Sequence, residues 1–129
     1  MNSSSVSVAK IAELLDLKNF TDEIDLKKRK ITTTDINRPA LQLTGYFEHF
    51  EESRVEIIGN VEYAYIQQMS DEEKRIRYDA FLKFDIPCVI FSRNLTPDPI
   101  FLKEAFANHV PVLGTGRSTS EFTAELIYT

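Results

Sequence analysis

The sequence contains few of the residues that mark several common protein classes. Glycine and proline occur only 4 and 5 times in 129 residues, which excludes a linker or a low-complexity chain. The single cysteine, Cys88, cannot form an internal disulfide, so a reducing compartment is expected. No segment approaches the roughly 18 consecutive apolar residues that span a bilayer, and residues 1–5 are polar, which argues against a signal peptide. We therefore expect a cytoplasmic protein with no membrane partner.

Positive charge is also scarce. The chain has 15 Lys and Arg against 20 Asp and Glu, a formal net charge of −5. Because nucleic acids are bound largely by neutralising their phosphates with basic side chains, we expect no nucleic-acid partner. The one basic run, residues 27–30, lies beside Asp22, Glu23 and Asp25. It is interpreted as a solvated surface segment, with a local patch for an anion or an acidic partner as the alternative.

The patterns of metal sites and of nucleophilic catalysis are missing as well. Neither of the two histidines, His49 and His109, has a second histidine or a cysteine at metal-ligand spacing, so no metal site is expected. Cys88 lies in an apolar run and is expected to be buried, which disfavours a Cys–His nucleophile pair. The Lys-containing phosphate loop of nucleotide-hydrolysing enzymes occurs nowhere in the chain. We expect no catalytic residue and no cofactor in this chain.

The residues that are present predict one α/β domain. Hydrophobic residues make up 43% and charged residues 27%, as in a soluble globular domain. Strands are predicted where β-branched or apolar residues cluster, at 31–36, 54–59, 88–91 and 110–113. Helices are predicted at 8–16 and 61–69, after Ser70, after Thr96, and from Ser118 to the chain end. The alternation of strand and helix in the second half predicts a three-layer fold, a largely parallel sheet with helices on both faces.

Several helix starts carry specific capping signals. Ser7 is predicted to cap the first helix. Ser70 with Glu73, and Ser118 with Glu121, form the Ser-x-x-Glu pattern of a capping box. For another helix, Thr96 is predicted as the N-cap with Pro97 at the first helical position. The helix behind Ser70 is expected to bury a stripe of Ile76, Ala80 and Phe84.

The first candidate binding segment follows the last predicted strand. It contains Gly114, Gly116, Arg117, Ser118 and Thr119 and leads into a helix, so backbone amides and the helix end could receive an anion. The dinucleotide-binding fingerprint is incomplete, because Thr119 stands where its third glycine would be. Two interpretations of this segment therefore remain: a structural turn with a capping box, or a weak site for an anion or another ligand.

The second candidate segment is 35–39. It places Asp35, Asn37 and Arg38 at the carboxyl end of a predicted strand, where ligand crevices of open α/β sheets lie. The alternative is a structural turn in which Arg38 pairs with Asp35. Asn37 and Arg38 thus join the first segment as candidates for a ligand-binding or interdomain site.

A resemblance to a known family extends over nearly the whole chain. Residues 31–47 resemble the hallmark segment of the amino-terminal domain of HPr kinase/phosphorylase, and the likeness continues through the segments 8–14, 54–59, 85–90 and 118–122. One departure is Ala40, where the family usually has glycine after Arg-Pro. The resemblance implies that residues 1–129 are a single amino-terminal domain and that the catalytic P-loop kinase domain is absent from this chain. It also implies a fold similar to the first domain of peptidoglycan-precursor (Mur) ligases.

The resemblance further implies what the parent enzyme does. Family members use ATP and magnesium to phosphorylate a serine of HPr, the phosphocarrier of the sugar phosphotransferase system, and remove that phosphate by phosphorolysis. The reaction serves carbon catabolite repression, and the enzymes are hexamers. ATP and magnesium would belong to the missing kinase domain. This chain would be a non-catalytic regulatory or assembly domain whose partners are its own kinase domain, neighbouring subunits and, for the parent, HPr. The alternative is a free-standing small-molecule or anion-binding α/β module.

Overall fold

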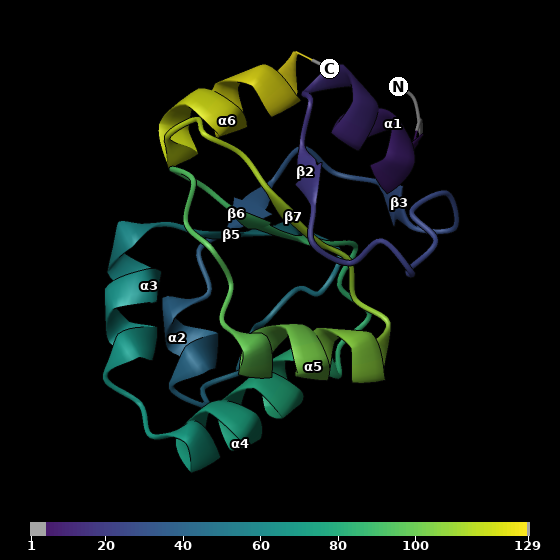
Figure 1. Cartoon of the computed structure of the whole chain (residues 1–129). Helices are drawn as coiled ribbons and strands as arrows, with labels where there is room; N and C mark the ends of the chain where they lie inside the picture. The colour runs from purple at the N-terminus through teal and green to yellow at the C-terminus, as the bar shows by residue number, and fades with distance from the viewer. Residues whose placement is uncertain (1–4, 129) are drawn as a thin grey trace.

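A five-stranded sheet organises the chain, as a computed structural model shows for residues 5–128 (Figure 1). Its strands are β2 (Lys18–Asn19), β4 (Ile36–Asn37), β5 (Val55–Ile58), β6 (Val89–Phe91) and β7 (Val112–Gly114). The strands lie in the order β2-β7-β6-β5-β4. β4 to β7 run parallel to one another, and β2 joins β7 antiparallel at the edge. The prediction of a largely parallel sheet is confirmed.

Helices cover both faces of this sheet, as predicted. The helices are α1 (Val8–Leu14), α2 (Ala40–Leu43), α3 (Asn60–Gln67), α4 (Asp71–Leu82), α5 (Pro99–Asn108) and α6 (Thr119–Ile127). The helices α2 to α5 lie on one face and α1 and α6 on the other (Figure 1). None of the helices within residues 5–128 has the length and apolar character needed to cross a membrane. The polar residues 1–4 and the expected helix end at residue 129 lie outside the described residues.

Each face of the sheet packs its own hydrophobic core. The core under α2 to α5 is built around large buried side chains such as Tyr78, Phe91 and Phe101. The opposite core contains Ile57 of β5 and Phe122 of α6. All residues of β5, β6 and β7 are buried, because a parallel strand with helices on both faces has no solvent-exposed side. This arrangement confirms the interpretation of the apolar run 88–91.

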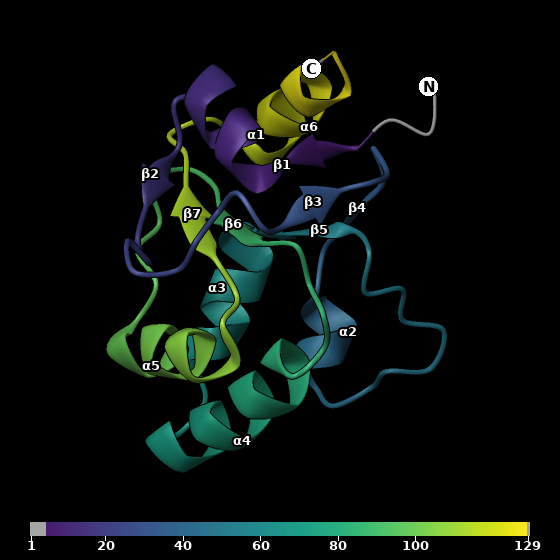
Figure 2. The same ribbon diagram turned by 90° about the vertical axis from the view of Figure 1, so that its right-hand side faces the viewer.

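The predicted strand 31–36 is wrong as a single element. The segment contains two short strands: β3 (Lys30–Ile31), and β4, which begins at Ile36. β3 pairs antiparallel with β1 (Val6–Ser7) in a separate small sheet, and Figure 2 shows this pair beside α1. Ile31 is buried in the core shared with α1 and α6, whereas the following threonines are exposed or half-buried. β-branched residues favour extended backbone, but a strand forms only where a neighbouring strand supplies backbone hydrogen bonds. Here the chain leaves the small sheet after Ile31 and joins the large sheet at Ile36.

The predicted cap at Thr96 is also wrong. Asp98 is the N-cap of α5, where its carboxylate accepts from the amide of Phe101 at 2.8 Å, and Pro99 occupies the first turn. Thr96–Pro97 and Asp98–Pro99 both combine an N-capping residue with a proline at the first helical position, so the local sequence does not distinguish them. Asp98 also accepts from the Tyr78 hydroxyl at 2.7 Å, so a contact with α4 favours the second pair.

The stripe predicted for α4 is misplaced. Ile76 is 59% exposed, and Ala80 and Phe84 are only half-buried. The buried residues of α4 are Tyr78, Phe81 and Leu82. Both sets have helical spacing, so periodicity alone does not decide between them. The Tyr78 side chain is buried in the core, and its hydroxyl donates to Asp98 at 2.7 Å.

Candidate functional site

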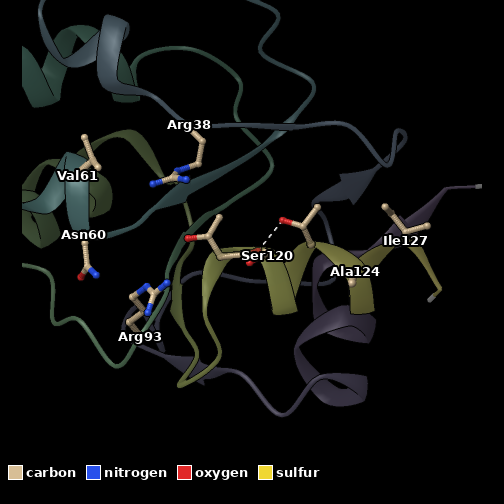
Figure 3. Close-up of a pocket in the computed structure, with 9 residues that line it drawn as sticks. Arg38, Asn60, Val61, Arg93, Ser120, Ala124 and Ile127 are labelled. Carbon is tan, nitrogen blue, oxygen red and sulfur yellow. Dashed lines mark hydrogen bonds between the residues drawn. The ribbon is translucent and has the colours of Figure 1, made fainter.

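A cavity of about 710 Å³ opens at the carboxyl ends of the parallel strands (Figure 3). Its walls come from the loops after β4 and β6, from the beginning of α3, and from one face along the length of α6. The lining residues are Arg38, Asn60, Val61, Arg93, Thr119, Ser120, Thr123, Ala124 and Ile127. This volume lies in the range of small-molecule sites, and this edge is where open α/β sheets place their ligands.

Arg38 follows β4 directly and is fixed by a buried acid. Its guanidinium donates to Oε1 of Glu62 from Nη2 at 2.7 Å and from Nε at 3.3 Å. The Glu62 side chain is only 3% exposed, and that of Arg38 is 38% exposed. The same Glu62 oxygen accepts from the amide of Gly59 at 2.8 Å. Glu62 therefore orients the guanidinium, which keeps Nη1 for another acceptor at the cavity.

Gly59 gives Arg38 the space it occupies. A Cβ atom at Gly59 would lie 2.8 Å from Nη2 of Arg38 and 2.8 Å from Oγ1 of Thr119. Its φ of −111° is accessible to any residue, so the requirement for glycine is steric rather than conformational. The glycine thus allows Arg38 and the start of α6 to approach each other.

Arg93 is presented to the cavity by a constrained turn after β6. Arg93 and Asn94 both have left-handed backbone, with φ of 57° and 59°. The amide of Arg93 donates to the carbonyl of Arg117 at 2.8 Å, and that of Asn94 to the carbonyl of Thr115 at 2.9 Å. These bonds join the β6–α5 loop to the β7–α6 loop. Arg93 is exposed, and its guanidinium points toward the same space as that of Arg38 (Figure 3).

Two helices begin at the cavity. Asn60 and Val61 are the first residues of α3, and Thr119 and Ser120 the first of α6. The predicted capping box of α6 is confirmed, because Ser118 Oγ accepts from the amide of Glu121 and Glu121 accepts from the amide of Ser118. This hydrogen bond to the Ser118 amide lowers the pKa of Glu121. Helix N-termini carry partial positive charge, which adds to that of the two arginines.

Of the predicted site residues, Arg38 and Thr119 line this cavity. Arg38 pairs with Glu62, so the pair with Asp35 that belonged to the alternative structural turn is not formed. Asn37 turns away from the cavity, and its Nδ2 donates to Oε1 of Glu56 at 2.7 Å and to Oε1 of Gln42 at 3.0 Å.

The other predicted residues of the last loop have other contacts. Gly114 and Gly116 line a separate pocket of about 200 Å³ together with Asn94. The Arg117 guanidinium donates to the carbonyl of Leu15 at 2.7 Å and forms an ion pair with Glu125. The first contact attaches the loop to the end of α1, and the second attaches it to α6. Ser118 serves as the helix cap.

Sequence reasoning missed most of the cavity wall. Asn60 and Arg93 lie just beyond predicted strands, so the rule that selected Arg38 could have selected them too. The apolar residues Val61, Ala124 and Ile127 carry no such signal, because exposed apolar residues are common on protein surfaces.

The remaining candidate for chemistry, Cys88, is not placed to act as a nucleophile. Its side chain is buried in the core with α1 and α6, and burial raises the pKa of the thiol to about 12. A nucleophilic cysteine needs a populated thiolate. Within residues 5–128, no group of three or more His, Cys, Asp or Glu side chains is placed to hold a metal ion.

The fold and the site together define a class: an α/β domain whose parallel sheet carries an arginine-lined pocket at its carboxyl edge. The family described as HPr Serine kinase N terminus matches residues 6–129. The chain therefore belongs to the HPr serine kinase amino-terminal domain family.

Similar proteins carry the name HPr kinase/phosphorylase. The chain is 42% identical over 123 residues to that of Lachnoclostridium phytofermentans, a match covering 95% of the chain and 40% of the relative. It is 39% identical over 120 residues to that of Caldicellulosiruptor bescii, covering 93% and 39%. The chain thus spans about two fifths of the length of these relatives.

The fold is also found among solved structures. One of them is the CBS and DRTGG domains of the regulatory region of Clostridium perfringens pyrophosphatase, complexed with the activator diadenosine tetraphosphate. The TM-score is 0.65 at 15% identity, over 94% of this chain and 46% of that chain. At this identity the likeness concerns the fold alone.

Proposed function

We propose that the chain is the non-catalytic regulatory and assembly domain of an enzyme that phosphorylates HPr on serine with ATP and removes the phosphate by phosphorolysis. The observation that carries the proposal is the family match over residues 6–129, on relatives of which the chain spans about two fifths.

The finer features of this proposal concern the parent enzyme. ATP and magnesium are bound by the kinase domain that follows, and the parent is a cytoplasmic hexamer active in carbon catabolite repression. The partners of the present domain are that kinase domain and neighbouring subunits, and HPr is the substrate of the whole enzyme. A fold relation to the first domain of Mur ligases belongs to the same proposal.

The test compares three purified proteins in an HPr phosphorylation assay with ATP and magnesium. These are the 129-residue chain, the whole relative from Lachnoclostridium phytofermentans, and that relative without its matching amino-terminal part. We expect no phosphorylated HPr from the chain alone. The truncated relative should keep its kinase chemistry but change its assembly state or its response to effectors.

Two results would overturn the proposal. One is phosphorylation of HPr by the isolated chain at a rate that persists after a second, unrelated purification step, which excludes a contaminating kinase. The other is a truncated relative that matches the whole enzyme in rate, assembly and regulation. The first would make the domain catalytic, and the second would leave it without the proposed role.

A second candidate function is that of a small-molecule or anion-binding module. The specific observation in its favour is the cavity into which Arg38 and Arg93 both point (Figure 3). The two functions are compatible, because a regulatory domain can act by sensing a ligand.

A further inference from the structure

We propose that the cavity between α3 and α6 binds a phosphate monoester with an apolar organic group. The phosphate lies between Arg38 and Arg93, and the organic group lies along α6. The inference rests on the anion-binding role proposed above and names the class of ligand.

The charge of the cavity points to a phosphate. Arg38 and Arg93 come from the loops after β4 and β6, on either side of β5, in a chain whose net charge is −5, so their convergence is a local feature. The Arg93 guanidinium can bind phosphate through paired hydrogen bonds, whereas Arg38, whose Nε and Nη2 donate to Glu62, contributes Nη1. Two acids lie near them: Glu62, which is buried and held by Arg38 and Gly59, and Glu121, which is bound to the amide of Ser118. Both acids accept hydrogen bonds from donors that fix their positions.

The start of α6 supplies further donors. The first-turn amides of a helix have no partner inside the helix. In α6 the capping box uses the amides of Ser118 and Glu121, and the first-turn residues Thr119 and Ser120 line the cavity. A dianionic phosphate beside Arg93 would thus also meet the positive end of a nine-residue helix.

The rest of the cavity points to the organic group. Ser120, Ala124 and Ile127 lie on one face of α6 at spacings of four and three residues, and all line the cavity (Figure 3). The rise from Ser120 to Ile127 is about 10 Å, the length of a phosphate ester that carries a ring. Ile127 is 54% exposed, so an apolar group covering it would remove apolar surface from water. A cavity of about 710 Å³ suits a small molecule of this kind.

The test is a titration of the ¹⁵N-labelled 129-residue chain with inorganic phosphate, phenyl phosphate and phenol, followed by amide chemical shifts. Inorganic phosphate should shift the amides around Arg38, Arg93 and Ser120. Phenyl phosphate should in addition shift Ala124 and Ile127 and bind about fivefold more tightly, because its ring covers apolar surface. Phenol alone should produce no saturable shifts.

Variants separate the two halves of the site. Arg93→Gln should weaken the binding of both phosphates about tenfold or more. Ile127→Ser should remove the advantage of phenyl phosphate and leave the affinity for inorganic phosphate unchanged. The matched control is Arg75→Gln, an exposed arginine on α4 that does not line the cavity, and it should alter neither affinity.

The inference is overturned if phenyl phosphate causes no saturable shifts at the cavity, or if Arg93→Gln and Arg75→Gln weaken binding equally. Equal weakening would mean binding to general surface charge. Such a failure is distinct from failure of the regulatory role, which the HPr assay on the longer relative measures without reference to this ligand.

Discussion

Glu56 places a carboxyl group in the middle of β5 with no exposed surface. Its Oε1 accepts from Asn37, and its Oε2 has no hydrogen-bond partner among the described residues. Burial raises the pKa of this carboxyl from 4.5 to about 8, because the ionised form loses its hydration. Glu56 is therefore protonated in the folded protein at neutral pH.

We predict that Glu56 makes the protein less stable as the pH rises. The folded protein keeps a proton that the unfolded chain releases, since the folded pKa of about 8 lies above the ordinary 4.5. The free energy of unfolding should fall between these two pH values by up to about 1.4 kcal/mol per unit. The variant Glu56→Gln, which mimics the protonated acid, should lose this slope in urea denaturation between pH 5 and 9.

The exposed Glu51→Gln is the control for that experiment, and it should retain the wild-type slope. An equal slope in wild type and Glu56→Gln would show that Glu56 ionises normally in the folded state.

At the scale of elements, two helices begin with the same local device. Ser70 and Glu73 start α4, and Ser118 and Glu121 start α6, each through reciprocal side-chain-to-amide bonds of 2.8 to 3.2 Å. Both were predictable because the partners are three residues apart. The two helices differ in their surroundings, since only α6 lines the arginine-containing cavity.

This pair of helices allows a matched prediction. Ser118→Ala and Ser70→Ala should each lower the free energy of unfolding by about 1 kcal/mol, the usual effect of losing a cap. Only Ser118→Ala should also weaken the binding of phenyl phosphate, by about threefold, because the start of α6 is less ordered. Thermal unfolding and the amide-shift titration measure the two effects, and equal affinities in the two variants would contradict the assignment of α6 to the site.

At the scale of the whole molecule, Arg29 connects the segment before β3 to the loops that precede β6 and β7, at the end of the sheet away from the cavity. Its guanidinium donates to Asp85 at 2.7 Å, to the carbonyl of Ile86 at 3.1 Å and to the carbonyl of His109. The Asp85 side chain is 84% exposed, so the ion pair itself contributes little. The contribution comes from the two backbone carbonyls in the loops before β6 and β7, which a charged donor satisfies.

We predict that Arg29→Gln lowers the free energy of unfolding by about 2 kcal/mol, as expected for hydrogen bonds from a charged group. The neighbouring Lys28→Gln, at an exposed position, should change it by less than about 0.5 kcal/mol. Urea denaturation of the three proteins gives the comparison. A loss confined to Lys28→Gln, or none in either variant, would mean that the segment before β3 is not held through Arg29.

The sequence by itself determined the features that depend on neighbouring residues. The caps at Ser7, Ser70 and Ser118 follow from hydrogen bonds between residues three positions apart. The buried strand around Val89 follows from a continuous apolar run, and the strand–helix alternation predicts a parallel sheet. The family resemblance, too, was visible in the order of motifs along the chain.

Only the tertiary structure decided which distant residues meet. Arg38 binds Glu62 rather than Asp35, and the segment 31–36 divides between two sheets, because strand partners and buried acids are chosen by packing across the domain. The cavity likewise combines Arg38, Arg93 and Ile127 from three separate segments. Local patterns specify a helix or strand through contacts within a few residues, whereas a binding site forms only where the folded sheet brings several loop ends together.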